Sequence, residues 1–202
     1  MTEDEERLGP AQVPGLGSAK KVSLNRRQRL LRLITSVLDP RAYLHALKLI
    51  NYYNYSHVAP LRRVTRGAGA AISPNAVFSH PERIFLGDRV RIGARCHLWA
   101  GPSHGRIEVG DDCLFGPDVL VTAANYRFND GSPVTDQKMD EADVRLGRDV
   151  WLGARVIVLP GVQIGDYAIV GAGAVVTKSI PQGAIAIGAP AKVFGQRSAM
   201  ER

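Results

Sequence analysis

Residues 144–176 read VRLGRD VWLGAR VIVLPG VQIGDY AIVGAG AVV, and this stretch decides the fold. An aliphatic residue recurs every six positions, and a smaller apolar residue stands two positions before it. The 3.6-residue period of a helix does not give this spacing. A strand with alternating side chains gives it, if the chain turns a corner every six residues. The recurring residues are Leu146, Leu152, Val158, Ile164, Val170 and Val176.

The same spacing runs upstream through two shorter stretches. Glycine follows the aliphatic residue in two of every three repeats, which implies three unequal sides and a coil of 18 residues. Glycine tolerates the positive φ and the close backbone approach of a tight corner. The pattern therefore predicts a mainly β fold, a parallel β-helix of hexapeptide repeats with a short N-terminal helical segment. The upstream aliphatic residues are Leu86, Ile92, Leu98, Val109, Phe115 and Val121.

Composition excludes several classes of protein. No run of about 18 apolar residues predicts a transmembrane helix, and the acidic start MTEDEER lacks the apolar core of a secretory signal. A cytoplasmic location is expected. The net charge is +7, but there is no nucleic-acid-binding motif and no aromatic stacking platform, so no nucleic acid partner is expected. Cys96 and Cys113 occupy inward positions and are predicted to be core residues.

Four segments are predicted along the chain: a disordered tail over 1–22, a helical segment over 23–70, the β-helix over 71–180 with a loop at 122–143, and a closing segment over 181–202. Asp39 and Pro40 indicate the cap and the first residue of a second helix. Two interpretations of the helices stay open. They pack on the end of the β-helix, or their basic amphipathic surface makes peripheral contact with acidic lipid.

Two breaks interrupt the six-residue spacing. Five extra residues lie between Leu98 and Val109, and a loop of about 20 residues separates Val121 from Val144. Because Leu98 and Val121 are equivalent positions in successive coils, both insertions should leave the same corner, about 4.8 Å apart. Long loops in compact domains are often functional. The sequence therefore predicts one composite site, with Ser103 and His104 under Tyr126 and Arg127.

Outward-facing positions indicate where subunits meet. The first side of the triangle carries mostly polar residues, whereas the other two carry apolar residues in the lower coils. Apolar patches on a soluble protein usually mark interfaces. A contact between the second side of one subunit and the third side of another closes most simply into a homotrimer. The apolar outward residues are Leu114, Trp151 and Ile169 on the second side, and Leu120, Ile157 and Val175 on the third.

Residues 150–166, 170–178 and 186–193 strongly resemble the hexapeptide-repeat acyltransferases, in particular the galactoside, maltose, nodulation-factor and surface-polysaccharide O-acetyltransferases. The resemblance covers about residues 70–196. It implies a left-handed β-helix, a homotrimer, acyl-CoA as donor, and active sites between subunits beside the long loop. No metal is expected. The resemblance also implies that the backbones of Ala154 and Ala172 line the pantetheine channel, and that Thr177, Lys178 and Lys192 lie near the nucleotide phosphates.

The sequence departs from this family at the expected catalytic histidine. That position holds Tyr126, preceded by Asn125, and a neutral tyrosine is a poor base near pH 7. Three interpretations stay open. His104 takes the proton from the acceptor; or Tyr126 and Asn125 orient the reactants while solvent or a loop carboxylate, Asp130 or Asp136, takes it; or catalysis has been lost.

The function expected from the resemblance is transfer of an acyl group, most simply acetyl, from coenzyme A to a hydroxyl of a sugar or glycan precursor. A non-catalytic trimeric β-helix that serves as a binding scaffold is the main alternative. A metal-dependent carbonic anhydrase on the same fold would need three histidines converging at an interface, and only His97 and His104 are placed near one.

Overall fold

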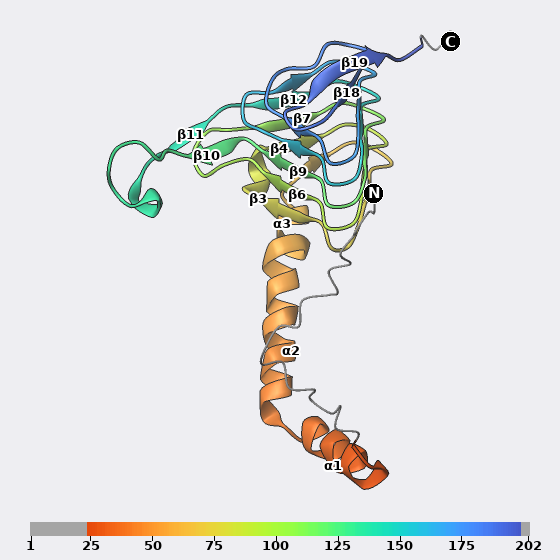
Figure 1. Cartoon of the computed structure of the whole chain (residues 1–202), viewed down its shortest axis with the longest axis vertical. Helices are drawn as coiled ribbons and strands as arrows, with labels where there is room; N and C mark the ends of the chain where they lie inside the picture. Colours follow the sequence, from red (N-terminus) through yellow and green to blue (C-terminus); the bar gives the residue numbers. More distant parts are fainter. Residues whose placement is uncertain (1–23, 199–202) are drawn as a thin grey trace, which may run out of the picture. The chain divides into compact units, whose positions relative to one another are not determined.

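The computed structural model describes residues 24–198, which form a parallel β-helix and the helices that precede it. Three parallel sheets make the sides of the β-helix, and successive coils stack along one axis (Figure 1). The predicted tail, residues 1–22, lies outside the described residues. The chain divides into two compact units, one ending at Ala46 and the other beginning at Leu47.

The strands are short because each side of the triangle is short. The first sheet contains β1 (Thr65–Arg66), β4 (Ile84–Leu86), β7 (Ile107–Val109), β12 (Val144–Leu146) and β15 (Gln163–Ile164). The second contains β2 (Ala71–Ile72), β5 (Arg91–Ile92), β8 (Leu114–Phe115), β13 (Trp151–Leu152), β16 (Ile169–Val170) and β18 (Ala184–Ile187), with β19 (Lys192–Gln196) antiparallel to β18. The third contains β3 (Val77–Ser79), β6 (His97–Trp99), β9 (Leu120–Thr122), β14 (Ile157–Val158) and β17 (Val175–Val176). The parallel sheets thus reach beyond residues 71–180 at both ends.

The register agrees with the six-residue spacing. Leu98 pairs with Val121, Val121 with Val158, and Val158 with Val176, so the third side stacks equivalent positions in successive coils. These side chains point inward and are fully buried, as are both cysteines. The core is therefore a continuous column of aliphatic residues, and Cys96 and Cys113 belong to it as predicted.

The glycines at the corners serve close packing rather than an unusual backbone conformation. Gly110 does not have a positive φ, but a Cβ placed on it would lie 2.6 Å from the carbonyl carbon of Gly147 in the next coil. Positive φ occurs two residues after such glycines, at non-glycine positions such as Arg89, Arg95 and Asp112. The sequence interpretation named both properties, and only the close approach applies to these glycines.

Both N-terminal helices begin at capping residues, and α2 begins where the sequence predicts. Asn25 caps α1 (Arg26–Val37) through a reciprocal pair of hydrogen bonds with Gln28, and the Asp39 side chain accepts a hydrogen bond from the Arg41 N–H at the start of α2 (Pro40–Tyr53). A π-helical turn, η1 (Asn54–Val58), and α3 (Ala59–Leu61) follow. Within residues 24–198 no helix has the length and apolar character needed to span a membrane.

We expect the Gly110→Ala variant to unfold more easily than the wild type. The added methyl group meets backbone atoms of Gly147 and Arg148 that cannot move without disturbing the next coil, and overpacking of this kind costs about 2 kcal/mol. Urea denaturation followed by circular dichroism measures the loss. The matched control is Gly195→Ala, because a Cβ there meets nothing within 4 Å. Equal stability of the two variants would contradict the close-packing role.

Candidate active site

Both breaks in the six-residue spacing leave the same corner, at the end of the third sheet. Trp99 pairs with Thr122 in the register, and the Ala123 N–H donates to the Trp99 carbonyl at 2.9 Å. Thr177 follows the pairing of Val158 with Val176 and so continues the same edge in a later coil. The expected composite corner therefore exists, and it also carries Thr177.

The predicted irregular loop at 122–143 contains regular structure. β10 (Ala124–Tyr126) and β11 (Met139–Glu141) pair as an antiparallel hairpin that extends away from the coils (Figure 1), and a short 3-10 turn, η3 (Val134–Asp136), lies between them. An ion pair of 2.6 Å between Arg127 and Asp140 joins the two arms of the hairpin. Cross-strand pairing therefore gives this loop a defined conformation, which its composition alone did not predict.

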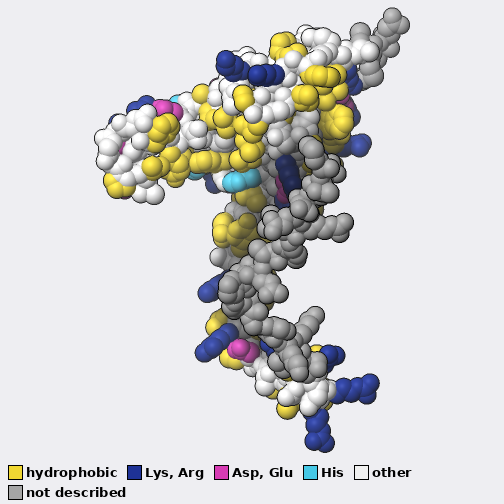
Figure 2. Space-filling view, in the orientation of Figure 1, with side chains coloured by type: hydrophobic (Ala, Val, Ile, Leu, Met, Phe, Trp, Pro, Cys, Tyr) yellow, Lys and Arg dark blue, Asp and Glu magenta, His cyan; other side chains and the backbone are white. Residues whose placement is uncertain are grey.

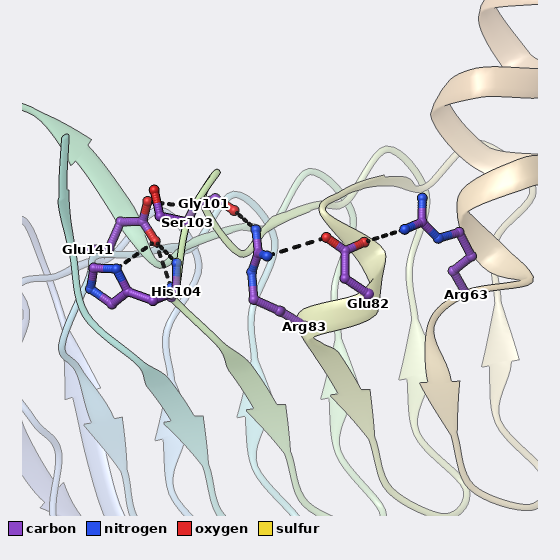
Figure 3. A network of polar contacts seen from close by, with 8 residues as sticks. Arg63, Glu82, Arg83, Gly101, Ser103, His104 and Glu141 are labelled. Atoms are coloured by element: carbon purple, nitrogen blue, oxygen red, sulfur yellow. Dashed lines mark hydrogen bonds and ion pairs between the residues drawn. The ribbon is translucent and has the colours of Figure 1, made fainter. Parts of the chain in front are cut away.

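The centre of the corner is a buried carboxylate, that of Glu141 (Figure 3). Three consecutive backbone N–H groups of the 101–106 insertion donate to it: Ser103 at 2.9 Å, and His104 and Gly105 at 2.6 Å each. The Glu141 side chain is only 2% exposed. The end of one insertion thus holds the other insertion in place, which makes the two loops one structural unit.

These contacts keep Glu141 charged. Burial by itself would raise the pKa of the carboxyl, but the hydrogen bonds from Gly105, His104 and Ser103 outweigh it and lower the pKa from its ordinary value of 4.5 to about 2. A carboxylate that accepts several backbone N–H bonds is favoured in its ionised form. Glu141 therefore places a fixed negative charge beneath the loop at neutral pH.

The insertion closes around Glu141 because two of its residues are glycines. Gly101 has φ +84°, and a Cβ on it would lie 2.9 Å from the Cβ of Ala124 and 3.0 Å from Cδ of Glu141. A Cβ on Gly105 would lie 2.5 Å from the Ala100 carbonyl oxygen. A larger residue at either position would push the loop away from the carboxylate.

A chain of charged groups supports the loop from the neighbouring coil (Figure 3). The Arg83 guanidinium donates to the Gly101 carbonyl and lies 3.4 Å from Glu82, which pairs with Arg63 at 3.2 Å. In the described part of the chain, Nε of Arg83 is buried and has no hydrogen-bond partner. Arg83 is therefore a second fixed charge against the insertion, of opposite sign to Glu141.

His104 lies at the surface of this unit. Its Nδ1 is 3.6 Å from Oε2 of Glu141, while its side chain is 73% exposed. No hydrogen bond to Nε2 of His104 is formed by any residue in 24–198. The ring is thus held near a carboxylate on one side and is accessible on the other. This is the arrangement of an imidazole whose second nitrogen can accept a proton.

Tyr126 and Asn125 are exposed residues of β10, on the hairpin that leaves the same corner. The sequence predicts that Tyr126 lies directly above His104, but the structure places Glu141 beside His104 instead. His104 contacts the β11 residue Glu141, whose register partner is Ala124, whereas Tyr126 pairs with Met139 two positions further out. The reason is that the hairpin extends away from the coils, so counting along the sequence does not follow the stack.

Four of the residues predicted to bind the donor lie at the two edges of the third sheet, and the fifth, Lys192, begins β19 of the second sheet. Ala154 and Ala172 stack in successive coils at the edge where this sheet begins, and the Gly173 N–H donates to the Ala154 carbonyl at 2.8 Å. Thr177 and Lys178 are exposed at the opposite edge, after β17. The Ala191 N–H donates to the Val175 carbonyl at 2.8 Å, which brings the chain next to Lys192 back to β17.

His97 is not part of this cluster. Its Nε2 lies 3.1 Å from Oγ of Ser79 on the outer face of the third sheet, and burial lowers the pKa of its ring. No group of three or more potential ligands arranged for a metal ion occurs within residues 24–198.

Sequence reasoning missed two residues of the site, Glu141 and Arg83. Glu141 stands three residues before the six-residue spacing resumes at Val144, which is a weak positional signal. Arg83 follows Pro81 and Glu82 in a short 3-10 turn, η2 (Pro81–Arg83), and its sequence context gives no signal. Both act on a loop that is distant in sequence, so only the folded chain reveals them.

Comparison with known proteins identifies the class of enzyme. The family "Bacterial transferase hexapeptide (six repeats)" matches residues 143–178. The galactoside O-acetyltransferase of Escherichia coli K12 is 28% identical over 187 residues, which is 85% of this chain and 88% of that protein. The chain is a hexapeptide-repeat acetyltransferase. The predicted enzyme class, an O-acyltransferase, and the left-handed β-helix that the resemblance implied are thereby confirmed.

Two further comparisons agree with this family. A putative lipopolysaccharide biosynthesis O-acetyl transferase of Escherichia coli K12, WbbJ, is 33% identical over 119 residues, which cover 55% of this chain and 59% of that protein. A solved structure of galactoside acetyltransferase in complex with coenzyme A superimposes with a TM-score of 0.63 at 26% identity, over 79% of this chain and 82% of that one. The similarity therefore extends well beyond the repeats.

We expect Glu141 to make the stability of the protein depend on acid pH. Its pKa is depressed in the folded state, so its contribution is complete above the ordinary value of 4.5 and is lost as the pH falls towards 2. The size is on the order of 3 kcal/mol. Urea denaturation at pH 7 and pH 3 should therefore show a larger loss for the wild type than for Glu141→Gln.

The matched control is Glu108→Gln, which removes a partly exposed carboxylate paired with Arg145. This variant should keep the pH dependence of the wild type. If Glu141→Gln also kept it, the three backbone hydrogen bonds would not be holding the carboxylate in its charged form.

Proposed function

We propose that this acetyltransferase moves an acetyl group from acetyl-CoA to a hydroxyl of a sugar or glycan precursor, with His104 as the general base. The observation that carries the proposal is the pairing of an exposed imidazole with a buried, charged carboxylate at the corner where both insertions meet. Galactoside and lipopolysaccharide O-acetyltransferases are among the relatives, which supports a hydroxylated acceptor.

The proposal gives each group a separate role. Glu141 lies on the Nδ1 side of His104 and stabilises the positive charge that the ring acquires when Nε2 takes the acceptor proton. The acceptor oxygen then attacks the thioester carbonyl carbon, the C–S bond breaks, and the thiolate leaves and recovers a proton. Asn125 and Tyr126, on the adjacent hairpin, are proposed to orient the acceptor or the carbonyl.

The residues expected to hold the donor fit a long, thin, anionic molecule. Ala154 and Ala172 present only methyl groups at their edge, and the outer face of the third sheet carries the half-buried side chains of Leu120, Ile157 and Val175. At the far edge, Thr177 and Lys178 offer a hydroxyl and an exposed cation. Lys192, the first residue of β19, offers another exposed cation. A lysine ammonium supplies a point charge for phosphate.

The proposal includes a homotrimer with sites between subunits. On the second sheet the outward residues Leu114 and Trp151 are 43% and 49% exposed in the single chain, and they stack in adjacent coils. Covering such a stripe with a neighbouring subunit would remove apolar surface from water. Light scattering that gave the mass of a single chain would contradict this contact. The proposed location is the cytoplasm, where acetyl-CoA is available.

Calorimetric titration with acetyl-CoA tests the donor assignment. We expect the wild type to bind, and Lys178→Ala to bind about fivefold more weakly, because one exposed charge contact contributes about 1 kcal/mol. Lys138→Ala, which removes an exposed lysine from the hairpin loop, is the control and should bind like the wild type. No binding by the wild type would favour the non-catalytic scaffold.

We expect His104→Gln to lower kcat about a hundredfold or more while leaving the Kd for acetyl-CoA unchanged, since a general base acts on the transition state and does not touch the donor phosphates. The readout is release of free thiol with a panel of sugar acceptors. His45→Gln, an exposed histidine of α2, is the matched control. Normal turnover in His104→Gln together with loss of turnover in Tyr126→Phe would show that the catalytic role belongs to Tyr126 on the hairpin and not to His104.

A further inference from the structure

Helix α1 carries an apolar stripe of exposed side chains. The stripe follows the spacing i, i+1, i+3, i+4, i+7, i+8 of an amphipathic helix, and no residue of α1 is buried. Its side chains are between 45% and 72% exposed. Single exposed leucines are ordinary, but six aliphatic side chains on one face form a continuous patch. They are Leu30, Leu31, Leu33, Ile34, Val37 and Leu38.

The charges around the stripe are all of one sign. α1 contains Arg26, Arg27, Arg29 and Arg32 and has no acidic residue; Asp39 is the only acidic residue between positions 24 and 81. Figure 2 shows Lys and Arg side chains projecting from the helical segment beside hydrophobic ones. The helix therefore combines an apolar stripe with cationic groups and no anionic one.

Two of these arginines stand where they are unfavourable for an isolated helix. Arg26 and Arg27 lie in the first turn, at the positive end of the helix dipole, where acidic residues would stabilise the helix. The capping box of Asn25 and Gln28 offsets part of this cost. Anionic groups outside the protein would satisfy both the arginines and the free N–H groups of this turn.

The same charges disfavour a second copy of α1 as the occupant. Two such helices packed side by side would bring their arginines together without a carboxylate to pair them. The stripe is also wider than the two positions per heptad that form the seam of a coiled coil. An anionic, apolar partner matches both features of the surface.

We propose that α1 is an interfacial helix that docks on an anionic lipid bilayer. The apolar stripe enters the boundary between headgroups and acyl chains, and the arginines reach the headgroup phosphates along their flexible stems. The helix lies on the membrane surface and does not cross it, in agreement with the absence of a membrane-spanning helix in the described residues. This inference does not depend on the residues of the acetyltransferase site.

Flotation of the full chain with vesicles tests the proposal. We expect the wild type to bind vesicles of phosphatidylcholine mixed with phosphatidylglycerol, and to bind pure phosphatidylcholine vesicles far more weakly. Arg29→Gln/Arg32→Gln should weaken binding on the order of thirtyfold, from about a fivefold contribution per arginine. The matched control, Arg62→Gln/Arg66→Gln, removes two exposed arginines outside α1 and should bind like the wild type.

A second pair of substitutions tests the apolar stripe. Leu30→Gln/Ile34→Gln keeps helix propensity and charge, and it should abolish binding to the mixed vesicles. Unchanged thermal unfolding would show that the β-helix is intact in both variants. Failure of the wild type to bind mixed vesicles would overturn the proposal. Retained binding of Leu30→Gln/Ile34→Gln would overturn it too, since charge adsorption alone would then explain the binding.

Light scattering distinguishes a membrane from a second copy of this chain as the partner of the stripe. If Leu30→Gln/Ile34→Gln reduced the oligomer mass and the wild type ignored anionic vesicles, the stripe would be a contact between copies of this chain. The membrane proposal would then be wrong.

Discussion

Every coil of this protein depends on backbone hydrogen bonds to the coils above and below it. The Gly116 N–H donates to Leu152, and the Gly153 N–H donates to Val170, so each short strand is paired only because its neighbours exist. Two-residue strands are not stable alone. Successive coils can approach closely enough to form these hydrogen bonds because glycines such as Gly110 place no side chain between neighbouring corners. Stability and register therefore arise together from the repeat.

The regular ladder also determines where irregular chain can be placed. An insertion within a side of the triangle would break the pairing of two adjacent coils, whereas an insertion at a corner leaves the strands in register. Both insertions occur at the edge that ends the third sheet, after Leu98 and Val121. They meet through the Glu141 carboxylate and three N–H groups. The stack thus brings together segments nearly 40 residues apart in the chain.

The helical segment distributes its apolar and charged residues differently from the β-helix. In the β-helix, apolar residues are inward and buried, and the charged residues outside pair with one another, as Arg95 does with Asp118 and Arg89 with Asp112. In α1 the apolar residues are exposed and the arginines have no acidic residue on the same helix. The basic, apolar composition of this helix is consistent with the proposed role at an anionic surface.

The sequence by itself determined the β-helix, its inward and outward residues, the start of α2 and the corner that carries the insertions, because each is a local or periodic property of the chain. It also supplied expected donor contacts. The fold places four of them at the two edges of the third sheet and the fifth in β19 of the second; they are Ala154, Ala172, Thr177, Lys178 and Lys192. Only the tertiary structure decided the β10–β11 hairpin, the approach of Glu141 to His104 and the position of Arg83. These depend on hydrogen bonds between residues distant in sequence, which no period in the sequence encodes.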